Sequence, residues 1–234
     1  MKSRMQIETL STADDVAARA AQIIARDARS AVAARGMFVM AVSGGRTPWQ
    51  MLRALANEDV PWAQVHVIQV DERIAPAGDP DRNLTHLRAS LLSHAPIPED
   101  QIHAMPVERE DLEQGCQDYT ALLQSLCGNP AVIDLAHLGL GPDGHTASLI
   151  PGDPVCEVQS AEVALTGVYQ TRRRMTLTYP ILNRSRHILW VVTGGEKALM
   201  LPRLLAGDPS IPAGPISQSI ATLLADAPAA AELK

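Results

Sequence analysis

The sequence predicts an α/β fold in three layers, with a mainly parallel central sheet flanked by helices. Short apolar runs that end in turns alternate along the chain with longer segments of helical periodicity. Repeated strand–turn–helix units of this kind favour parallel strands, as in Rossmann-like folds. The length of 234 residues fits one large domain, so we treat residues 1–234 as a single α/β domain.

The first predicted element is a long helix over residues 11–36. Ser11 or Thr12 can cap its start, and Gly36 can end it. The alternation then continues with strands predicted at 37–42, 65–70, 132–141 and 187–195, and helices at 48–57, 82–94 and 110–128.

Two C-terminal segments are predicted to be helical. The segment beginning at Glu196 reads as the start of a helix that Pro202 must cut or kink. The Ala-rich end, residues 223–234, is predicted to be a helix tail.

Four predicted strands end in loops that are rich in polar residues and glycine. These loops are "SGGRTP" (43–48), "DER" (71–73), "GPDGHTAS" (141–148) and "TGGEK" (193–197). In an open parallel sheet, ligands bind outside the carboxyl ends of the strands. We therefore expect all four loops to converge on one site.

Composition excludes several classes of partner and cofactor. The net charge is −6 and no block of Lys or Arg is present, which argues against nucleic-acid binding. The three cysteines are scattered, and the histidines lack metal-ligand spacing, so neither a disulfide framework nor a metal site is expected. The first ten residues do not resemble a signal peptide, and no apolar run reaches about 18 residues. A cytoplasmic protein without membrane contact is expected.

The loop at 43–48 has the chemistry of a phosphate site. Ser43, Gly44, Gly45 and Thr47 offer backbone N–H groups at the start of a helix, where the helix dipole favours an anion. The loop is not a Walker A motif. An ordinary tight turn between a strand and a helix is the alternative.

Asp71, Glu72 and Arg73 directly follow an apolar strand. Such a charged triplet is most often a solvated cluster. At a strand end, however, one carboxylate could instead orient a histidine or a substrate hydroxyl.

Gly139, Gly141 and Gly144 form a G-x-G-x-x-G pattern, which is typical of dinucleotide-binding loops. Glu162 lies near the distance expected for the ribose-binding acidic residue. However, "PGDPV" (151–155) interrupts the helix that such a site requires. The dinucleotide interpretation is therefore disfavoured.

The same glycine loop carries Asp143 and His145. Imidazole titrates near neutrality and is the commonest general base in enzymes. A His–Asp pair on a glycine loop at a strand end favours catalysis over a capping histidine.

Basic residues that could bind an anionic substrate lie late in the chain. Arg172, Arg173 and Arg174 are consecutive, and Lys197 follows the last predicted strand. We expect one or two of these arginines to be functional. A solvated loop and a surface lysine are the alternative.

Five ordered motifs resemble the 6-phosphogluconolactonase family, which shares its fold with glucosamine-6-phosphate deaminases. The matching segments are "SGGRTP", "DERIAP" with Asn83, "GLGPDGHTASLIPG", "RMTLTYPILN" and "GGEKA". The resemblance covers about residues 11–230. There are departures: Arg46 replaces a serine of the phosphate loop, Ile150 replaces a phenylalanine, and Val70 precedes the acidic motif. Arg46 either adds a phosphate contact or points to solvent.

The resemblance implies hydrolysis of 6-phospho-D-glucono-1,5-lactone to 6-phospho-D-gluconate in the oxidative pentose phosphate pathway, without metal or cofactor. It implies that His145 activates a water and that Asp71 orients His145 or a sugar hydroxyl. The phosphate would be held by the Gly44–Gly45 turn with Arg174 and Lys197, and Arg73 is a further expected substrate- or phosphate-binding residue.

Two alternatives remain. A deaminase–isomerase would carry a loop resembling G-x-G-x-D-G-H-I-A-F-N-E-P, whereas "HTASLIPG" lacks its Glu-Pro. A non-catalytic sugar-phosphate sensor would not need the Asp143–His145 pair.

Overall fold

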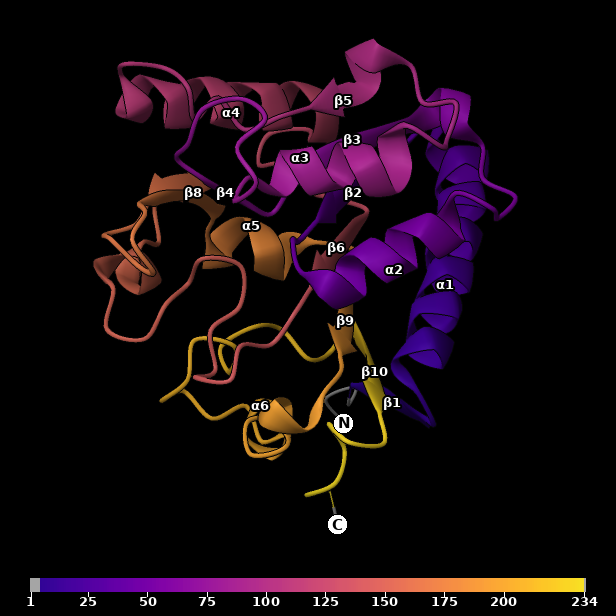
Figure 1. Cartoon of the computed structure of the whole chain (residues 1–234). Helices are drawn as coiled ribbons and strands as arrows, with labels where there is room; N and C mark the ends of the chain where they lie inside the picture. Colours follow the sequence, from indigo (N-terminus) through magenta and orange to yellow (C-terminus); the bar gives the residue numbers. More distant parts are fainter. Residues whose placement is uncertain (1–4, 234) are drawn as a thin grey trace.

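The computed structural model describes residues 5–233 and centres on a seven-stranded parallel sheet (Figure 1). From one edge to the other, its strands are β1 (Gln6–Leu10), β10 (Ala221–Asp226), β9 (His187–Val192), β6 (Leu135–Leu138), β2 (Phe38–Val42), β3 (Val65–Gln69) and β5 (Ile102–His103). Every neighbouring pair is parallel. The predicted mainly parallel α/β fold is confirmed.

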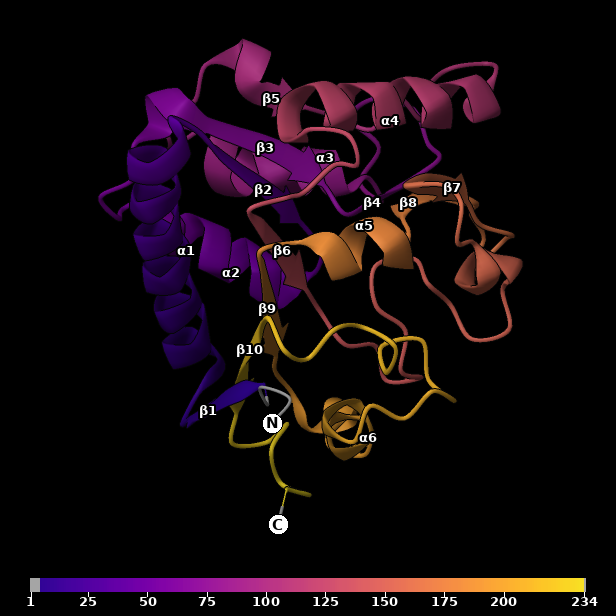
Figure 2. The ribbon, with the colours of Figure 1, turned by 180° about the vertical axis from the view of Figure 1, so that it is seen from behind.

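Helices cover both faces of this sheet. One face carries α1 (Ala13–Arg35), α2 (Arg46–Leu55) and α3 (Asn83–Leu87), which continues as a π-helical turn over Arg88–Leu92. The other face carries α4 (Leu112–Cys127), α5 (Tyr179–Arg184) and α6 (Leu201–Leu205). Figure 1 shows α2 and α3 in front of the sheet, and Figure 2 shows α5 on the opposite face.

Strand β2 shows how the two cores are separated. Phe38 and Met40 pack into the core beneath α1 and α2, whereas Val39 and Ala41 pack into the core on the other face. Alternate side chains of a strand point to opposite faces. A strand buried on both faces therefore reads as a continuous apolar run, as "MFVMAV" does.

The predicted boundaries of the first helix are confirmed. The Thr12 side chain accepts a hydrogen bond from the Asp15 backbone N–H, and Asp15 accepts one in return from the Thr12 N–H. This reciprocal arrangement is a capping box. The helix ends at the residue before Gly36.

A second, antiparallel sheet was not predicted. It consists of β4 (Asp71–Arg73), β8 (Arg174–Leu177) and β7 (Val163–Leu165), in that order. The backbone N–H of Leu177 donates to the carbonyl of Val70, so β8 is tied to the segment that leaves β3. This sheet therefore stands at the carboxyl end of the central one.

Two C-terminal predictions are wrong. Residues 223–226, expected in a helix tail, belong to β10, which packs between β1 and β9 because its apolar side chains fill both cores. Pro202 does not end a helix but lies in the first turn of α6. A proline fits there because the first turn requires no intrahelical N–H bond.

Short 3₁₀ helices complete the chain at Trp62–Gln64, Glu99–Gln101, Pro154–Glu157 and Gly195–Lys197. Within residues 5–233, no helix is both long and apolar enough to cross a membrane.

Candidate active site

A cleft of about 800 Å³ opens at the carboxyl edge of the central sheet. All four polar loops contribute to it. Asp226, the last residue of β10, also lines the cleft, and this was not predicted. The chain runs from β2 to β3 on one side and later returns to β6 on the other side of β2. Such a reversal of strand order leaves a crevice where ligands bind in α/β folds.

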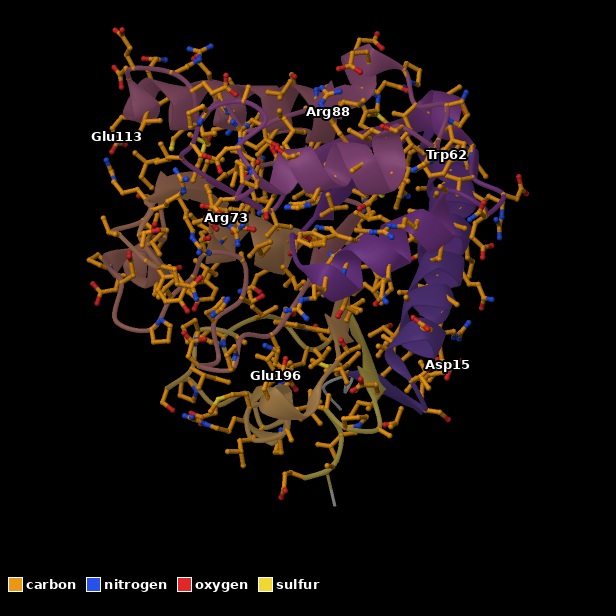
Figure 3. The ribbon with its side chains drawn as sticks, viewed as in Figure 1. Asp15, Trp62, Arg73, Arg88, Glu113 and Glu196 are labelled. Atoms are coloured by element: carbon orange, nitrogen blue, oxygen red, sulfur yellow. The ribbon has the colours of Figure 1, made fainter. Side chains whose placement is uncertain are left out.

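Ten of the eleven predicted site residues line this cleft: Ser43, Gly44, Gly45, Arg46, Thr47, Asp71, Arg73, His145, Arg174 and Lys197. The remaining one, Asp143, does not line the cleft but contacts His145. Figure 3 labels Arg73, from β4, and Glu196, from the 3₁₀ turn before α6, which both line the cleft.

His145 and Asp143 form a close hydrogen-bonded pair. The Nδ1 atom of His145 lies 2.5 Å from Oδ1 of Asp143, and the His145 backbone N–H donates to the same oxygen at 3.2 Å. Burial alone would raise the pKa of Asp143, but the charge of His145 and these bonds outweigh it and lower the pKa. A carboxylate on Nδ1 holds the proton there, which leaves Nε2 as the proton acceptor.

The glycines of this loop make room for the pair. A Cβ atom on Gly141 would lie 2.1 Å from Nδ1 of His145 and 2.7 Å from Oδ1 of Asp143. Gly144 has a φ of +85° and lies against Ile211. The chain continues from His145 to Asp153 in turns and a short bridge, where a dinucleotide site would have its crossover helix.

Asp71 is oriented by neighbours other than His145. Its Oδ2 accepts a 2.6 Å hydrogen bond from the Ser148 hydroxyl, and the Asn83 amide donates to its backbone carbonyl at 2.9 Å. Asn83 also explains Gly44, because a Cβ there would lie 1.9 Å from the Asn83 side-chain oxygen. These contacts do not support Asp71 orienting His145 and leave the sugar-hydroxyl role.

Arg73 and Arg174 form a cationic pair on the antiparallel sheet. The two residues are directly opposite in the ladder between β4 and β8. Arg174 is only 4% exposed, and the Nε atoms of both arginines are buried without a hydrogen-bond partner. Burial lowers the pKa of Arg174, and the charge of Arg73 lowers it further. Because like charges opposite one another are destabilising, this pair suits an anionic ligand.

The other two arginines of the run lie elsewhere. Arg172 forms ion pairs with Asp79 and Asp81, and the Nε of Arg173 donates to the Thr166 carbonyl. Neither lines the cleft. Of the three arginines, Arg174 lines the cleft, and its role in binding stays a prediction.

The start of α2 opens toward the cleft. Gly45 occupies the N-cap position, and no side chain caps the helix. The first N–H groups of a helix have no intrahelical acceptor and attract anions. Arg46 is exposed and lines the cleft, and Thr47 is fixed by a 2.5 Å hydroxyl contact with Thr193 after β9.

The hydrogen-bond donors of Ser43 bond to His137, whereas the sequence predicted that they bind a phosphate. Its hydroxyl donates to the His137 carbonyl at 2.8 Å, and its N–H donates to Nδ1 of His137 at 3.2 Å. Both donors are thus used to join β2 to β6, so Ser43 is not free to donate to a phosphate. Burial lowers the pKa of His137 to about 3, which keeps the ring neutral as an acceptor.

Metal ligands do not cluster in the part of the chain that the structure describes. Residues 5–233 contain no group of three or more His, Cys, Asp or Glu side chains placed to hold an ion. The three cysteines are free thiols.

The chain matches one known protein family over most of its length. Residues 11–224 match the family described as glucosamine-6-phosphate isomerases/6-phosphogluconolactonase. The chain belongs to this family. A 6-phosphogluconolactonase of Synechocystis is 35% identical over 205 residues, which cover 86% of this chain and 85% of the relative. One of Mycobacterium tuberculosis is 35% identical over 241 residues, which cover 97% and 98% of the two chains.

A solved structure agrees with the fold. The 6-phosphogluconolactonase of Thermotoga maritima superimposes with a TM-score of 0.85 at 27% identity, over 95% of this chain and 99% of that chain.

Sequence reasoning missed Ser148 and Tyr169, which contact Asp71 and Asp143 respectively. It noted Asn83 in a motif without a role. A hydroxyl residue and a tyrosine in loops give no signal by type or spacing, because their partners lie 77 and 26 residues away.

Proposed function

We propose that this chain hydrolyses 6-phospho-D-glucono-1,5-lactone to 6-phospho-D-gluconate in the oxidative pentose phosphate pathway, with a water activated by His145. One observation carries the proposal: a single cleft is lined both by His145, which is hydrogen-bonded to Asp143, and by the facing arginines Arg73 and Arg174. A phosphorylated lactone combines an electrophilic carbonyl with an anionic phosphate. His145 can activate a water to attack the carbonyl, and the arginines can bind the phosphate.

His145 acts as the general base. With Nδ1–H donated to Asp143, Nε2 accepts a proton from water as the water oxygen attacks C1 of the lactone. Donors in the cleft stabilise the oxyanion that forms on the carbonyl. The C1–O5 bond then breaks, and the proton passes from His145 to the departing oxygen. Asp143 stabilises the imidazolium between these steps.

The phosphate positions the ring without taking part in the chemistry. The Gly44–Gly45 turn, the start of α2, Arg174 and Lys197 supply backbone donors and positive charge. Arg46 and Thr47 are at the same helix start. Asp71, fixed by Ser148, accepts a hydrogen bond from a sugar hydroxyl.

The same family includes amino-sugar phosphate isomerases, so a deaminase–isomerase is the competing function. The loop expected of a deaminase, G-x-G-x-D-G-H-I-A-F-N-E-P, has a glutamate directly before its proline. Here Ile150 precedes Pro151 and is buried, which places no carboxylate at that point. A sensor is disfavoured because the Asp143–His145 pair is intact.

The decisive experiment measures lactone opening and ammonia release from glucosamine 6-phosphate in parallel, with spontaneous hydrolysis subtracted. We expect only lactone opening. The His145→Ala variant should lose about 10²–10⁴-fold in kcat, whereas His94→Ala, at an exposed histidine outside the cleft, should match the wild type. If His145→Ala keeps more than about half of the activity, His145 is not the base.

The reaction requires neither a metal nor a nucleotide, because a lactone carbonyl is attacked by water without a Lewis acid. Dialysis against a strong chelator should leave lactone opening unchanged. Calorimetric titration with NAD or NADP should give no heat of binding. Activity that is lost to the chelator and restored by zinc or magnesium would overturn this part of the proposal.

A further inference from the structure

The hairpin that joins β7 to β8 ends in a strained two-residue turn. Tyr169 and Arg172 exchange backbone hydrogen bonds of 3.0 and 3.3 Å, and the two residues between them have positive φ, 49° at Gln170 and 75° at Thr171. Such turns are normally built from Asn-Gly. A β-branched residue in the left-handed region is costly and persists where its surroundings hold it.

This turn places Tyr169 between the two halves of the proposed catalytic machinery. The Tyr169 hydroxyl donates to Oδ2 of Asp143 at 3.1 Å. Its ring meets the His145 ring edge-on, with centroids 5.7 Å apart, and the Arg174 guanidinium lies 5.0 Å from the ring centroid. One side chain thus touches the base, its carboxylate and the buried arginine.

The two oxygens of Asp143 are therefore held from opposite sides. Oδ1 receives the hydrogen bonds of His145, and Oδ2 receives that of Tyr169. Burial and the adjacent carboxylate raise the pKa of Tyr169, so its hydroxyl is a neutral donor. A hydrogen bond to Oδ2 prevents the carboxylate from rotating away from the imidazole.

We propose that Tyr169 is a positioning residue with two separable roles: its hydroxyl orients Asp143 toward His145, and its ring holds Arg174 in place for the phosphorylated substrate. The assignment of these roles to kcat and KM rests on the proposed lactonase function. The contacts with Asp143 and Arg174 do not.

Other charged groups around His145 stay constant in a comparison of Tyr169 variants. Those that line the same cleft, together with Asp143 on the loop of His145, are Arg174 on β8, Asp71 and Arg73 on β4, Arg46 and Arg53 on α2, Glu196 and Lys197 after β9, and Asp226 at the end of β10. Segment 211–214, which packs on Gly144, carries no titratable side chain. A difference in pH behaviour between wild type and Tyr169→Phe therefore reports the link to Asp143.

Two substitutions separate the roles. Tyr169→Phe removes the hydroxyl and keeps the ring, so kcat should fall about tenfold while KM changes little. Tyr169→Leu removes both and should in addition raise KM about three- to tenfold, because the cation–π contact is lost. Val168→Ala changes a side chain on the same hairpin that is 71% exposed, and it should match the wild type.

A direct titration of the His145 ring by NMR gives a readout that is independent of turnover. In Tyr169→Phe the Asp143 carboxylate is no longer held against the imidazole. The imidazolium is then less stabilised, so the midpoint should fall, and the acid limb of kcat/KM should move downward with it. An unchanged or raised midpoint, or equal effects of the Phe and Leu variants on kcat and KM, would overturn the proposal. If the wild type opens no lactone, the proposed function fails, and the titration still decides the Tyr169–Asp143 link.

Discussion

Alanine at Gly141 should disable the site while leaving the fold intact. The new Cβ would lie 2.1 Å from Nδ1 and 2.3 Å from Cε1 of His145, whereas ordinary contacts begin near 3.4 Å. The ring must therefore move by about 1 Å or more, and it loses its 2.5 Å bond to Asp143. Misplacing a reacting group by about 1 Å costs about 10²-fold in rate, which sets the expected fall in kcat.

Gly139 and Gly144, the other two glycines of the G-x-G-x-x-G pattern, serve as controls for the effect of an added Cβ on stability. A Cβ on Gly139 meets nothing within 4 Å, so Gly139→Ala should keep the wild-type Tm. Gly144→Ala forces an alanine to a φ of +85° with its Cβ 2.7 Å from Cβ of Ile211, and should lose at least about 1–2 kcal/mol of unfolding free energy. Gly141→Ala should lose little, because the atoms it displaces belong to the side chains of His145 and Asp143, which are 21% and 35% exposed and can move into the cleft or the solvent.

The assay is lactone opening at saturating substrate, with Tm measured on the same preparations. Our reasoning would be refuted by a Gly141→Ala enzyme that keeps more than half of the wild-type kcat. A Gly139→Ala variant that unfolds as early as Gly144→Ala would equally contradict the assignment of separate roles to these glycines.

Three further perturbations test other parts of the structure. Arg174→Ala should raise KM for the lactone about 10- to 100-fold through loss of a charge-assisted bond. Arg172→Ala should leave KM unchanged, because Arg172 is paired with two aspartates outside the cleft. Equal KM values for the two variants would argue against Arg174 binding substrate. Thr171→Gly should raise the unfolding free energy, measured in urea, by up to about 1 kcal/mol, because glycine adopts a φ of 75° without the strain that threonine has there. A loss of stability in this variant would show that no strain is stored at Thr171. Burial alone would raise the pKa of Asp27, but the hydrogen bonds and charges of His187 and Arg26 outweigh it, so the pKa is lowered. This carboxylate therefore stabilises the fold above its unfolded pKa, near 4, and the stability is lost as pH falls through the lower folded pKa. Asp27→Asn should thus be about 1–2 kcal/mol less stable at pH 7, with the gap closing below about pH 4; a gap independent of pH would contradict this.

The sequence by itself determined the architecture and the edge of the sheet that carries the site. Buried parallel strands read as apolar runs, and turn residues mark their ends, so the order of elements follows from local patterns. Because parallel strands all point the same way, loops that follow them must meet, as "SGGRTP" and "GPDGHTAS" do. The proximity of Asp143 and His145 was predictable for the same local reason.

Only the tertiary structure decided which side chains act together. Apart from the family resemblance of "RMTLTYPILN", nothing in "RRR" distinguishes Arg174 from Arg172. The ladder between β4 and β8 does, because its register sets Arg174 opposite Arg73. The C-terminal strand, read as a helix tail, is fixed by its place between β1 and β9. Tyr169 reaches Asp143 across 26 residues of chain through the fold of one hairpin. Such contacts depend on strand register and loop path, which are set by packing between distant segments and leave no periodic signal in the sequence.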